Sequence, residues 1–564
     1  MSEQKEQEDV KKEISRRGFL KAGSAAMGTM VLGSVVAGCS HNVTGIDKGG
    51  DTGTTPNTTA PLTAETAAKQ WAFEIPPAAI ADSNITRTVN AEIIVIGAGT
   101  SGLVCANTAA EGGAKVIVIA KSTKPVGYGG SNHAYNSRIM KKLGFNYDIN
   151  KAVRAEMASA SFQPDQRKWS LFYKNSGEAM NWLMDKMEAA GYTTVIERLS
   201  FDDPSGVLTA HIGAHSWIGS DVQLGGDSQP QVAGVLAATA LKSGVEINYN
   251  TVAEQLVRNS SGRVTAVIAK ASDGTYTKYV GSKAIVLATG DITADPEMVA
   301  KYCPKVVGMQ GLSPNTGDGQ KMGLWVGAAW QKVQHAAPMC VGAPGVSPDP
   351  YGACPGLMVN KNAERYSNED TVISFAAYDI MSQPEQKAFG IWTAKLAGIS
   401  TTWYPFGSYY GSPGMSQADV ITGWDNPASG IVKADTLNDL ATKLGLPASA
   451  LKATVDRYNT LCKNRIDEDF HKRAELLVPI EAGPFYGSMF SPMMFAVTGG
   501  LRTNTKMQIL DKNDKVIPGL YGVGSLVGDM YNNCYTFLVT GMNLGANCVT
   551  FGYLTGKALA AGTA

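Results

Sequence analysis

Two short apolar runs flank a helical pattern in the chain between residues 92 and 119. Residues 92–96 and 115–119 are rich in β-branched residues, a pattern typical of strands buried on both faces of a parallel sheet. The segment 103–112 consists of small and apolar residues and predicts a helix. Another buried strand is expected over residues 284–290. The strand–helix–strand order favours an α/β fold with a parallel sheet.

The turn between the first strand and the helix has the glycine spacing GxGxxG. It reads Gly97, Ala98, Gly99, Thr100, Ser101 and Gly102. The first glycine permits a tight turn, the second lets a pyrophosphate approach the backbone, and the third allows close packing of the helix on the strand. N–H groups at the start of the helix face the phosphates. We therefore predict a dinucleotide site whose contacts are Gly97, Ala98, Gly99, Ser101 and Gly102.

The end of the second strand lacks the acidic residue that usually binds the adenosine ribose in such sites. Ala120 and Lys121 stand there instead, so we expect Lys121, Ser122 or backbone atoms to contact the ribose. A second glycine-rich loop follows at residues 127–131, where a long cofactor would continue. This loop adds Gly130 and Ser131 to the expected contacts.

Residues 1–39 have the pattern of an export signal. Arg16 and Arg17 form a twin-arginine pair, and the uncharged stretch 22–38 that follows spans about 25 Å as a helix. This length is shorter than the ~30 Å hydrocarbon core of a membrane, which favours a signal segment over a transmembrane helix. Residues 36–39 resemble a lipobox, so Cys39 is the expected lipid carrier. The alternative is cleavage near Ala37 without lipid.

Composition narrows the classes of function. The 564-residue chain has 49 Lys+Arg and 49 Asp+Glu residues, and this neutrality argues against a nucleic-acid-binding surface. Its hydrophobic content of 44% supports a large core and excludes wholesale disorder. Residues 40–66 are rich in threonine and glycine and predict a flexible tether, which we extend to residue 88. Eight cysteines and six histidines form no CxxC, iron–sulfur or HExxH spacing, so we expect no metal site.

Further segments carry a resemblance to a known family. They are residues 127–131, 284–290, 314–319, 359–366 and 517–524. Together with the GxGxxG turn they resemble the flavoprotein family of soluble fumarate reductases, urocanate reductases and 3-ketosteroid Δ1-dehydrogenases. The resemblance implies FAD as cofactor and adds five expected contacts, which are Asp318, Ser525, Gly541, Asn543 and Leu544. Ser525 stands where fumarate reductases carry a glutamate for the ribitol.

The same resemblance implies a discontinuous architecture. A Rossmann-like FAD-binding domain would comprise residues 89–333 and 496–564, with an α+β capping domain inserted at residues 334–495. The substrate would bind between the cap and the flavin, where closure of the cap excludes water.

The cations with which fumarate reductases bind two carboxylates are missing from the matching positions. Ile373 stands at the proton-donating arginine, Phe495 at the histidine, and Val539 at the C-terminal carboxylate clamp. A dicarboxylate would be poorly held without paired donors, so we do not expect fumarate as the substrate.

Aromatic residues occupy the loop before the last helix. In ketosteroid dehydrogenases a tyrosine of this region and a glycine N–H polarise the substrate ketone. The matching tyrosine position lies nearest Phe537 and the glycine is Gly541, so the neighbouring Tyr535, with Tyr531, is the expected catalytic tyrosine. A phenol suits this task because it can donate to a developing enolate. The alternative for Tyr535 is a packed side chain bonded to a main-chain carbonyl. A second aromatic run at residues 403–410 would line an apolar pocket or pack on the cap core.

Arg502 is the third catalytic candidate, because it is the only arginine close to the expected site in the C-terminal third of the chain. It would bind a single carboxylate, or else cap a turn. Arg365 and Glu369 are expected to form a structural ion pair in the cap.

These features predict an exported flavin-dependent reductase of an activated C=C bond in an enone, acrylate or steroid-like compound. Because we expect no further redox centre in the chain, a membrane or multihaem cytochrome would supply the electrons in anaerobic respiration. The alternatives are a 3-oxosteroid-type dehydrogenase and an exported flavin electron carrier. The expected location is outside the cytoplasm, on the cell membrane through the lipid anchor or in the periplasm without it.

Overall fold

The computed structural model describes residues 70–145, 148–197, 212–222, 228–309, 311–337, 339–342, 356–371, 373–400, 416–536 and 538–564. Several features expected from the sequence lie outside these residues. They are the export signal with Cys39, the tether up to residue 69 and the aromatic run at residues 403–410. The side chain of Ile373 also lies outside the described part.

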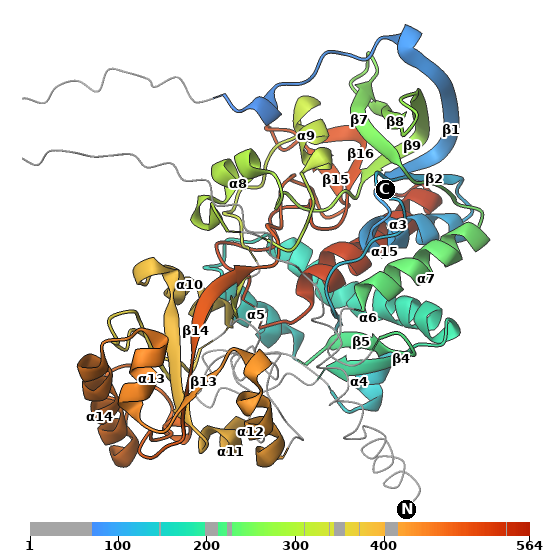
Figure 1. Cartoon of the computed structure of the whole chain (residues 1–564). Coiled ribbons are helices and arrows are strands. Elements are labelled where there is room, and N and C mark those ends of the chain that lie inside the picture. The colour runs from blue at the N-terminus through green and yellow to red at the C-terminus, as the bar shows by residue number, and fades with distance from the viewer. Residues whose placement is uncertain are drawn as a thin grey trace, which may run out of the picture.

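A sheet of eight strands forms the core of the larger domain (Figure 1). In spatial order its strands are β15 (Gln508–Leu510), β16 (Val516–Gly522), β9 (Tyr276–Leu287), β1 (Ile85–Ile96), β2 (Val116–Ile119) and β6 (Glu246–Asn248), while β8 (Val264–Ala271) and β7 (Thr251–Arg258) continue from β9. β1 runs parallel to β2 and to β9, and Ile93 lies opposite Val116 and Ala284. These residues are buried, so the predicted apolar runs do form the parallel core.

The folded chain begins well before the expected boundary at residue 89. The first half of β1 pairs with β9 but carries mostly exposed polar side chains, so no apolar run marks it in the sequence. Ahead of β1, Phe73 is buried and packs against Tyr302 at a ring-centroid distance of 5.7 Å. The indole N–H of Trp325 donates a hydrogen bond to the carbonyl of Phe73 at 2.8 Å. Residues 70–88 therefore belong to the larger domain, which corrects the predicted end of the tether.

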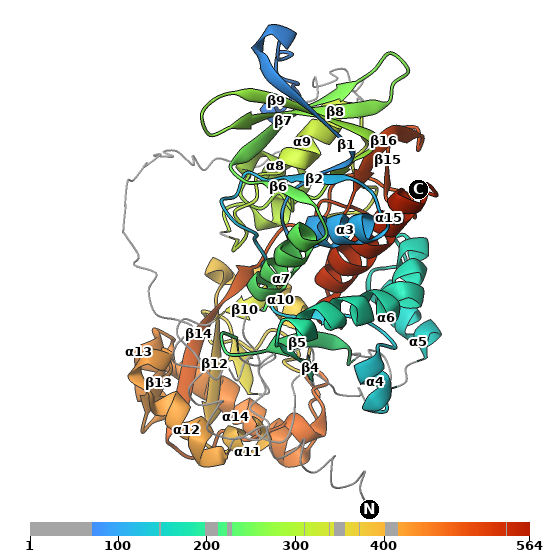
Figure 2. The same ribbon diagram turned by 90° about the vertical axis from the view of Figure 1, so that its right-hand side faces the viewer.

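Helices cover the parallel sheet. α3 (Thr100–Glu111) packs against α7 (Gln229–Lys242) and the C-terminal helix α15 (Phe551–Ala561), as Figure 2 shows. The approach of α15 requires a glycine, because a Cβ at Gly556 would lie 2.0 Å from Thr108 Oγ1. A π-helical turn, η7 (Leu544–Thr550), leads into α15 and contacts α3 and α6 (Gln166–Ala189). The other helices are α4 (Arg138–Lys142), α5 (Ile149–Ser159), α8 (Pro296–Tyr302) and α9 (Asp318–Trp325).

Two antiparallel sheets complete the fold. The small one consists of β3 (Asn132–His133), β5 (Ala214–Ile218) and β4 (Thr193–Glu197). The other forms the cap domain, drawn in yellow and orange in Figure 1, and its order is β10 (Met339–Gly342), β14 (Phe485–Met494), β12 (Ala388–Thr393) and β11 (Leu357–Val359), with β13 (Val432–Ala434) paired to β14. The cap helices are α10 (Ile373–Met381), α11 (Leu396–Ser400), α12 (Gln417–Asp425), α13 (Leu437–Leu444) and α14 (Ala448–Asn464).

Candidate functional site: a flavin cleft with a tyrosine pair

The glycine turn between β1 and α3 has the geometry of a phosphate-binding turn. Gly97 adopts φ +119°, and a Cβ there would lie 2.3 Å from the carbonyl oxygen of Ala288. A Cβ at Gly102 would lie 2.1 Å from the carbonyl oxygen of Gly97. Gly99 is the N-cap residue of α3 and has no side chain that could bond to the first N–H groups of the helix. These N–H groups therefore remain available to an anion.

Lys121 and Asp318, both predicted as cofactor contacts, lie together although 197 positions separate them in the chain. The ammonium of Lys121 is 2.7 Å from Asp318 Oδ2 and donates to Thr316 Oγ1 at 3.1 Å. Burial of Asp318 opposes ionisation, but hydrogen bonds from Lys121 and Thr316 hold its pKa below the usual value. The ion pair therefore joins the end of β2 to the start of α9 at the edge where the ribose contact was expected.

The second glycine-rich loop meets the start of the last helix. Gly541 adopts φ +74°, and a Cβ there would lie 2.5 Å from the carbonyl oxygen of Ser131. The carbonyl of Gly130 accepts hydrogen bonds from the Ser228 hydroxyl at 2.6 Å and from Gln229 Nε2 at 3.2 Å. The two segments thus form one continuous wall, as expected if one long cofactor contacts both.

A third group of predicted contacts gathers around the Ser525 hydroxyl. This hydroxyl accepts a hydrogen bond from Asn543 Nδ2 at 2.9 Å. Gly524 brings the same loop to Ser101, because a Cβ at Gly524 would lie 2.4 Å from Ser101 Oγ. Leu544 extends to the second glycine-rich loop, where its Cδ1 atom would lie 3.2 Å from a Cβ at Gly129. The GxGxxG turn and the C-terminal segment therefore face each other across one site.

Buried polar atoms without a partner among the described residues show that this site fits a polar cofactor. They are Asn132 Nδ2, Gln320 Oε1 and Asn547 Oδ1. Such atoms are costly unless a ligand or water satisfies them. None of the three was predicted, although each carries a signal: Asn132 and Gln320 adjoin predicted contacts, and Asn547 lies one helical turn after Asn543.

Tyr531 and Tyr535 form a buried pair beside this site. Their ring centroids are 4.8 Å apart and their planes are tilted by 52°. The Tyr535 hydroxyl oxygen accepts a hydrogen bond from the backbone N–H of Asn543 at 3.1 Å. The phenol oxygen is the acceptor in this bond, and the catalytic role of Tyr535 stays a prediction. Burial raises the pKa of both tyrosines, so both hydroxyls are protonated at neutral pH.

Arg502 has the contacts of the turn-capping alternative. Its guanidinium lies 2.8 Å from Asp514 Oδ1 and donates to the carbonyl of Trp330 at 3.0 Å. Asp514 is about half exposed and also pairs with Lys332. Asp514 and a main-chain carbonyl engage this side chain, while its buried Nε atom has no hydrogen-bond partner among the described residues; the catalytic role of Arg502 stays a prediction.

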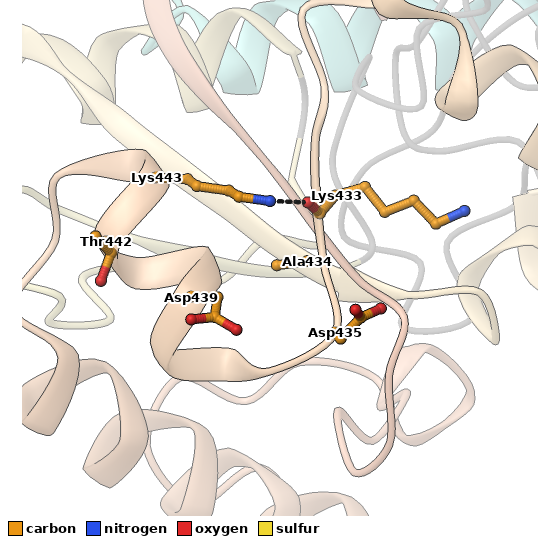
Figure 3. Close-up of a pocket in the computed structure, with 6 residues that line it drawn as sticks. All are labelled: Lys433, Ala434, Asp435, Asp439, Thr442 and Lys443. Carbon is orange, nitrogen blue, oxygen red and sulfur yellow. Dashed lines mark hydrogen bonds between the residues drawn. The ribbon is translucent and has the colours of Figure 1, made fainter.

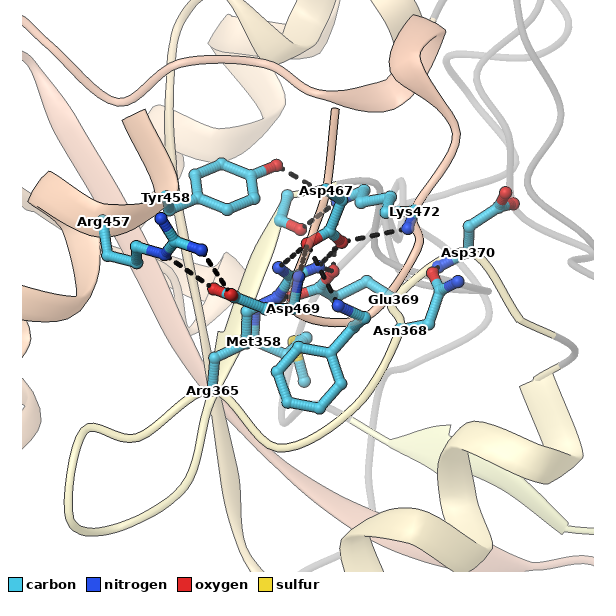
Figure 4. Close-up of polar contacts among 12 residues, drawn as sticks. Met358, Arg365, Asn368, Glu369, Asp370, Arg457, Tyr458, Asp467, Asp469 and Lys472 are labelled. Carbon is cyan, nitrogen blue, oxygen red and sulfur yellow. Dashed lines mark hydrogen bonds and ion pairs between the residues drawn. The ribbon is translucent and has the colours of Figure 1, made fainter. Parts of the chain in front are cut away.

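The cap contains the expected ion pair of Arg365 and Glu369 within a larger buried network (Figure 4). Arg365 also makes two hydrogen bonds to Asp467, 102 positions away. Lys472 is fully buried and donates to the carbonyl of Gly356 at 2.6 Å. The network ties the segment after β11 to the segment after α14. The sequence could not reveal Asp467 and Lys472, because only tertiary contacts bring them to Arg365.

A histidine that the sequence analysis overlooked lies near residues 498–500. His335 Nδ1 donates to the carbonyl of Thr498 at 2.8 Å, and His335 Nε2 accepts from the Trp330 indole at 2.9 Å. Burial lowers the pKa of His335 to about 4, so the ring is neutral and both nitrogens are engaged. His335 therefore does not replace the carboxylate-binding cation that is missing at Phe495.

A pocket on the cap is lined by Lys433, Ala434, Asp435, Asp439, Thr442 and Lys443 (Figure 3). Lys443 Nζ donates to the carbonyl of Lys433 at 2.8 Å, and the lining includes no residue of the flavin cleft. Within the described part of the chain, no cluster of three or more His, Cys, Asp or Glu residues could hold a metal. The described helices include none that is long and apolar enough to span a membrane.

Comparison with known proteins agrees with this geometry. A family model described as FAD binding domain matches residues 92–536. The vinyl phenol reductase of Lactiplantibacillus plantarum is 26% identical over 506 residues, which cover 83% of this chain and 94% of that protein. The digoxin reductase of Eggerthella lenta is 24% identical over 599 aligned positions, which cover 98% of each chain.

A solved structure shows the same fold. The 3-ketosteroid-Δ4-(5α)-dehydrogenase of Rhodococcus jostii RHA1 superposes with a TM-score of 0.68 at 22% identity, covering 85% of this chain and 99% of that one. This confirms the predicted α/β fold class, and the relatives are reductases and dehydrogenases of C=C bonds. The chain therefore belongs to the family with this FAD binding domain and is an FAD-dependent oxidoreductase.

Proposed function

We propose that this enzyme reduces a C=C bond conjugated to a ketone, ester, lactone or aryl carboxylate, and that it is nearly inert toward fumarate. The observation that carries the proposal is the buried pair of Tyr531 and Tyr535 at the start of the last helix. No Lys, Arg or His occurs in the sequence between Lys515 and Lys557, which includes this loop and the helix. A segment with phenol donors and no cation of its own suits a neutral carbonyl better than a dicarboxylate.

The tyrosine pair would perform the chemistry that the cofactor does not. FAD, when bound, supplies the hydride that reduces one carbon of the double bond. The protein must stabilise the charge that develops on the carbonyl oxygen and must deliver a proton. Tyr535 suits both tasks, because burial keeps its hydroxyl protonated at neutral pH. Its bond to the Asn543 N–H orients the ring without using the phenol proton.

The same property supports the reductive direction. Desaturation of a ketone would require a base, and burial makes the phenolate of Tyr535 costly. Reduction requires the protonated phenol, which is the form that burial favours. The names of the relatives support unsaturated aromatic and steroid-like compounds as the substrate class.

We also propose that the enzyme lies outside the cytoplasm, either lipid-anchored at Cys39 or free in the periplasm. Its electron donor would be a membrane cytochrome or a multihaem cytochrome. The twin arginines at residues 16 and 17 and the lipobox-like residues 36–39 support this location.

The acceptor can be identified with reduced holoenzyme under anaerobic conditions. The flavin is reduced with dithionite, and its absorbance is followed after addition of enones, unsaturated lactones, aryl acrylates or fumarate. We expect reoxidation by at least one carbonyl-conjugated alkene and not by fumarate. Fast reoxidation by fumarate contradicts the proposal, and bleaching of the oxidised flavin by a saturated ketone would instead indicate the dehydrogenase.

A further inference from the structure

A carboxyl group lies buried behind the tyrosine pair. Glu156, on α5, is only 5% exposed although no sequence motif marks it. Its Oε1 atom accepts a hydrogen bond from the hydroxyl of Thr536 at 2.8 Å. Its Oε2 atom is buried and has no hydrogen-bond partner among the described residues. Because Thr536 directly follows Tyr535 in the chain, this bond joins Glu156 to the tyrosine loop.

The tyrosine loop, residues 529–536, is fastened to α5 and α6 along its length. The Trp169 indole donates to the carbonyl of Met530 at 2.8 Å, and the Trp169 ring meets Tyr531 edge-on at 6.3 Å. Asn532 Nδ2 donates to the carbonyl of Ala160 at 3.4 Å. Glu156 therefore lies beneath a loop that is held in a fixed position.

Several weak acids lie near Glu156, while the cations Lys305 and Lys168 bond to Asn533 of the tyrosine loop and to the carbonyl of Gly528 just before it. Its charge acts on Tyr173, Tyr531, Tyr535 and Cys534, each of which is neutral at pH 7. Burial raises the pKa of Glu156 to about 7, and the hydrogen bond from Thr536 offsets only part of that effect. Glu156 can therefore carry a proton at neutral pH and release it at little cost.

Tyr531 lies in the same buried cluster with an unsatisfied hydroxyl. This hydroxyl has no hydrogen-bond partner in the described part of the chain, and its ring packs on Tyr535. Glu156 Oε2 and the Tyr531 hydroxyl, both buried without a hydrogen-bond partner among the described residues, thus lie in the same buried cluster as the proposed proton donor. A buried polar atom without a partner is costly, which argues for a role in the reaction.

We propose that Glu156 is the internal acid that returns a proton to the Tyr531–Tyr535 pair in each turnover; this rests on the proposed function. The Tyr535 O–H bond breaks as its proton goes to the substrate, while the hydride from reduced FAD supplies the two electrons. The Tyr535 oxygen regains a proton from the neighbouring Tyr531 hydroxyl. Because Tyr531 and Glu156 Oε2 are not hydrogen-bonded to each other, the carboxyl proton of Glu156 then reaches Tyr531 through a buried water bound to both atoms. The Glu156 carboxylate then takes a proton from water before the next turnover.

Glu156→Gln separates this role from a structural one. Glutamine is the neutral isostere of the protonated acid and can still accept the hydrogen bond from Thr536, but it has no proton to supply. We expect kcat to fall by about tenfold or more with KM and FAD content unchanged, since one acid–base group contributes about 10²–10⁴-fold. The solvent isotope effect on reoxidation of the reduced flavin should increase. Wild-type kcat in Glu156→Gln would overturn the proposal.

Tyr173→Phe is the matched control. Tyr173 belongs to the same buried cluster, but its hydroxyl lies 3.3 Å from that of Tyr135 and is no part of the proposed relay. This variant should retain wild-type kcat. An equal loss in both variants would indicate general damage to the cluster and overturn the assignment to Glu156.

A second measurement needs no substrate, so its outcome is independent of the proposed function. Infrared spectra of the oxidised holoenzyme should contain the C=O stretch of a protonated buried carboxyl near neutral pH. The band should be missing in Glu156→Gln and present in Tyr173→Phe. Identical carboxyl bands in wild type and Glu156→Gln would show that Glu156 holds no proton, which overturns the proposal even if an alkene substrate is found. If no alkene reoxidises the flavin, the proposed function fails while this band still reports on Glu156.

Discussion

The hydroxyl oxygen of Tyr535 lies 3.1 Å from the backbone nitrogen of Asn543 and accepts its hydrogen bond. This contact joins the proposed proton donor to the start of the helix that carries the predicted FAD contacts Asn543 and Leu544. The position of the phenol relative to the cofactor is therefore fixed by the main chain and not by another mobile side chain.

Replacing Tyr535 with phenylalanine should lower kcat by about 10²-fold, because only donation in the transition state is lost. FAD content should not change, and steady-state kinetics with the identified alkene measure the effect. Tyr192→Phe is the control, since the Tyr192 hydroxyl bonds to Asp221 on the surface. An unchanged kcat in Tyr535→Phe would leave Tyr535 with a packing role.

Purified enzyme should contain one FAD per chain and no iron, haem or zinc, and Gly97→Ala should lose FAD. A methyl group at residue 97 would lie 2.3 Å from the Ala288 carbonyl, at a φ of +119°. Strain of about 1–3 kcal/mol should weaken FAD binding by about tenfold or more. Flavin absorbance measures the FAD content of both proteins, and metal analysis measures iron and zinc. Gly234→Ala, where a Cβ meets no atom within 4 Å, should keep its FAD; stoichiometric iron would contradict the first part.

The stability of the holoenzyme should depend on pH through Glu156. Burial raises the pKa of Glu156 from 4.5 to about 7, so the folded state binds more protons between these values than the unfolded state. The stability from this group is fully present below pH 4.5 and is lost as the pH rises through 7. Relative to Glu156→Gln, the free energy of unfolding of the wild type should fall by about 3 kcal/mol over that range. Urea unfolding at several pH values tests this, and parallel pH profiles would contradict it.

Cell fractionation tests the proposed location. Cys39→Ala should release the enzyme from the membrane or leave it unprocessed, because the proposed lipid carrier is lost. Arg16→Lys with Arg17→Lys should retain it in the cytoplasm. Firm membrane binding of Cys39→Ala would show that lipid on Cys39 is not the anchor.

The sequence predicted the parts of the site that depend on local structure. The strand, turn and helix around residues 97–102 form as expected. Their signals, the apolar run and the glycine spacing, depend only on residues within about twenty positions of one another. Lys121 was also expected at the ribose edge, but its ion pair with Asp318 depends on the packing of α9 near β2. Contacts between segments far apart in the chain could be named only through the family resemblance.

Residues whose role depends on burial could not be predicted. Glu156 follows Arg154 and Ala155 in a helix of mixed composition, and a single acid in such a helix is normally solvated. In the fold, Thr536 of the tyrosine loop bonds to Glu156, and α6 packs against the same helix. For Arg502, the position in the sequence suggested a place near the expected site. In the fold, its guanidinium bonds to Asp514, twelve positions later in the chain.

The meeting of Gly541 with Ser131, and of Gly524 with Ser101, also orders events during synthesis. One wall of the cofactor site comes from residues 97–133, and another comes from residues 524–547. The ribosome must therefore add residues 134–523 after the first segment before the second can complete the site around a nucleotide. On this placement, a nascent chain that stops before residue 524 lacks the contacts around Gly524, Ser525 and Gly541 and should not hold FAD in full.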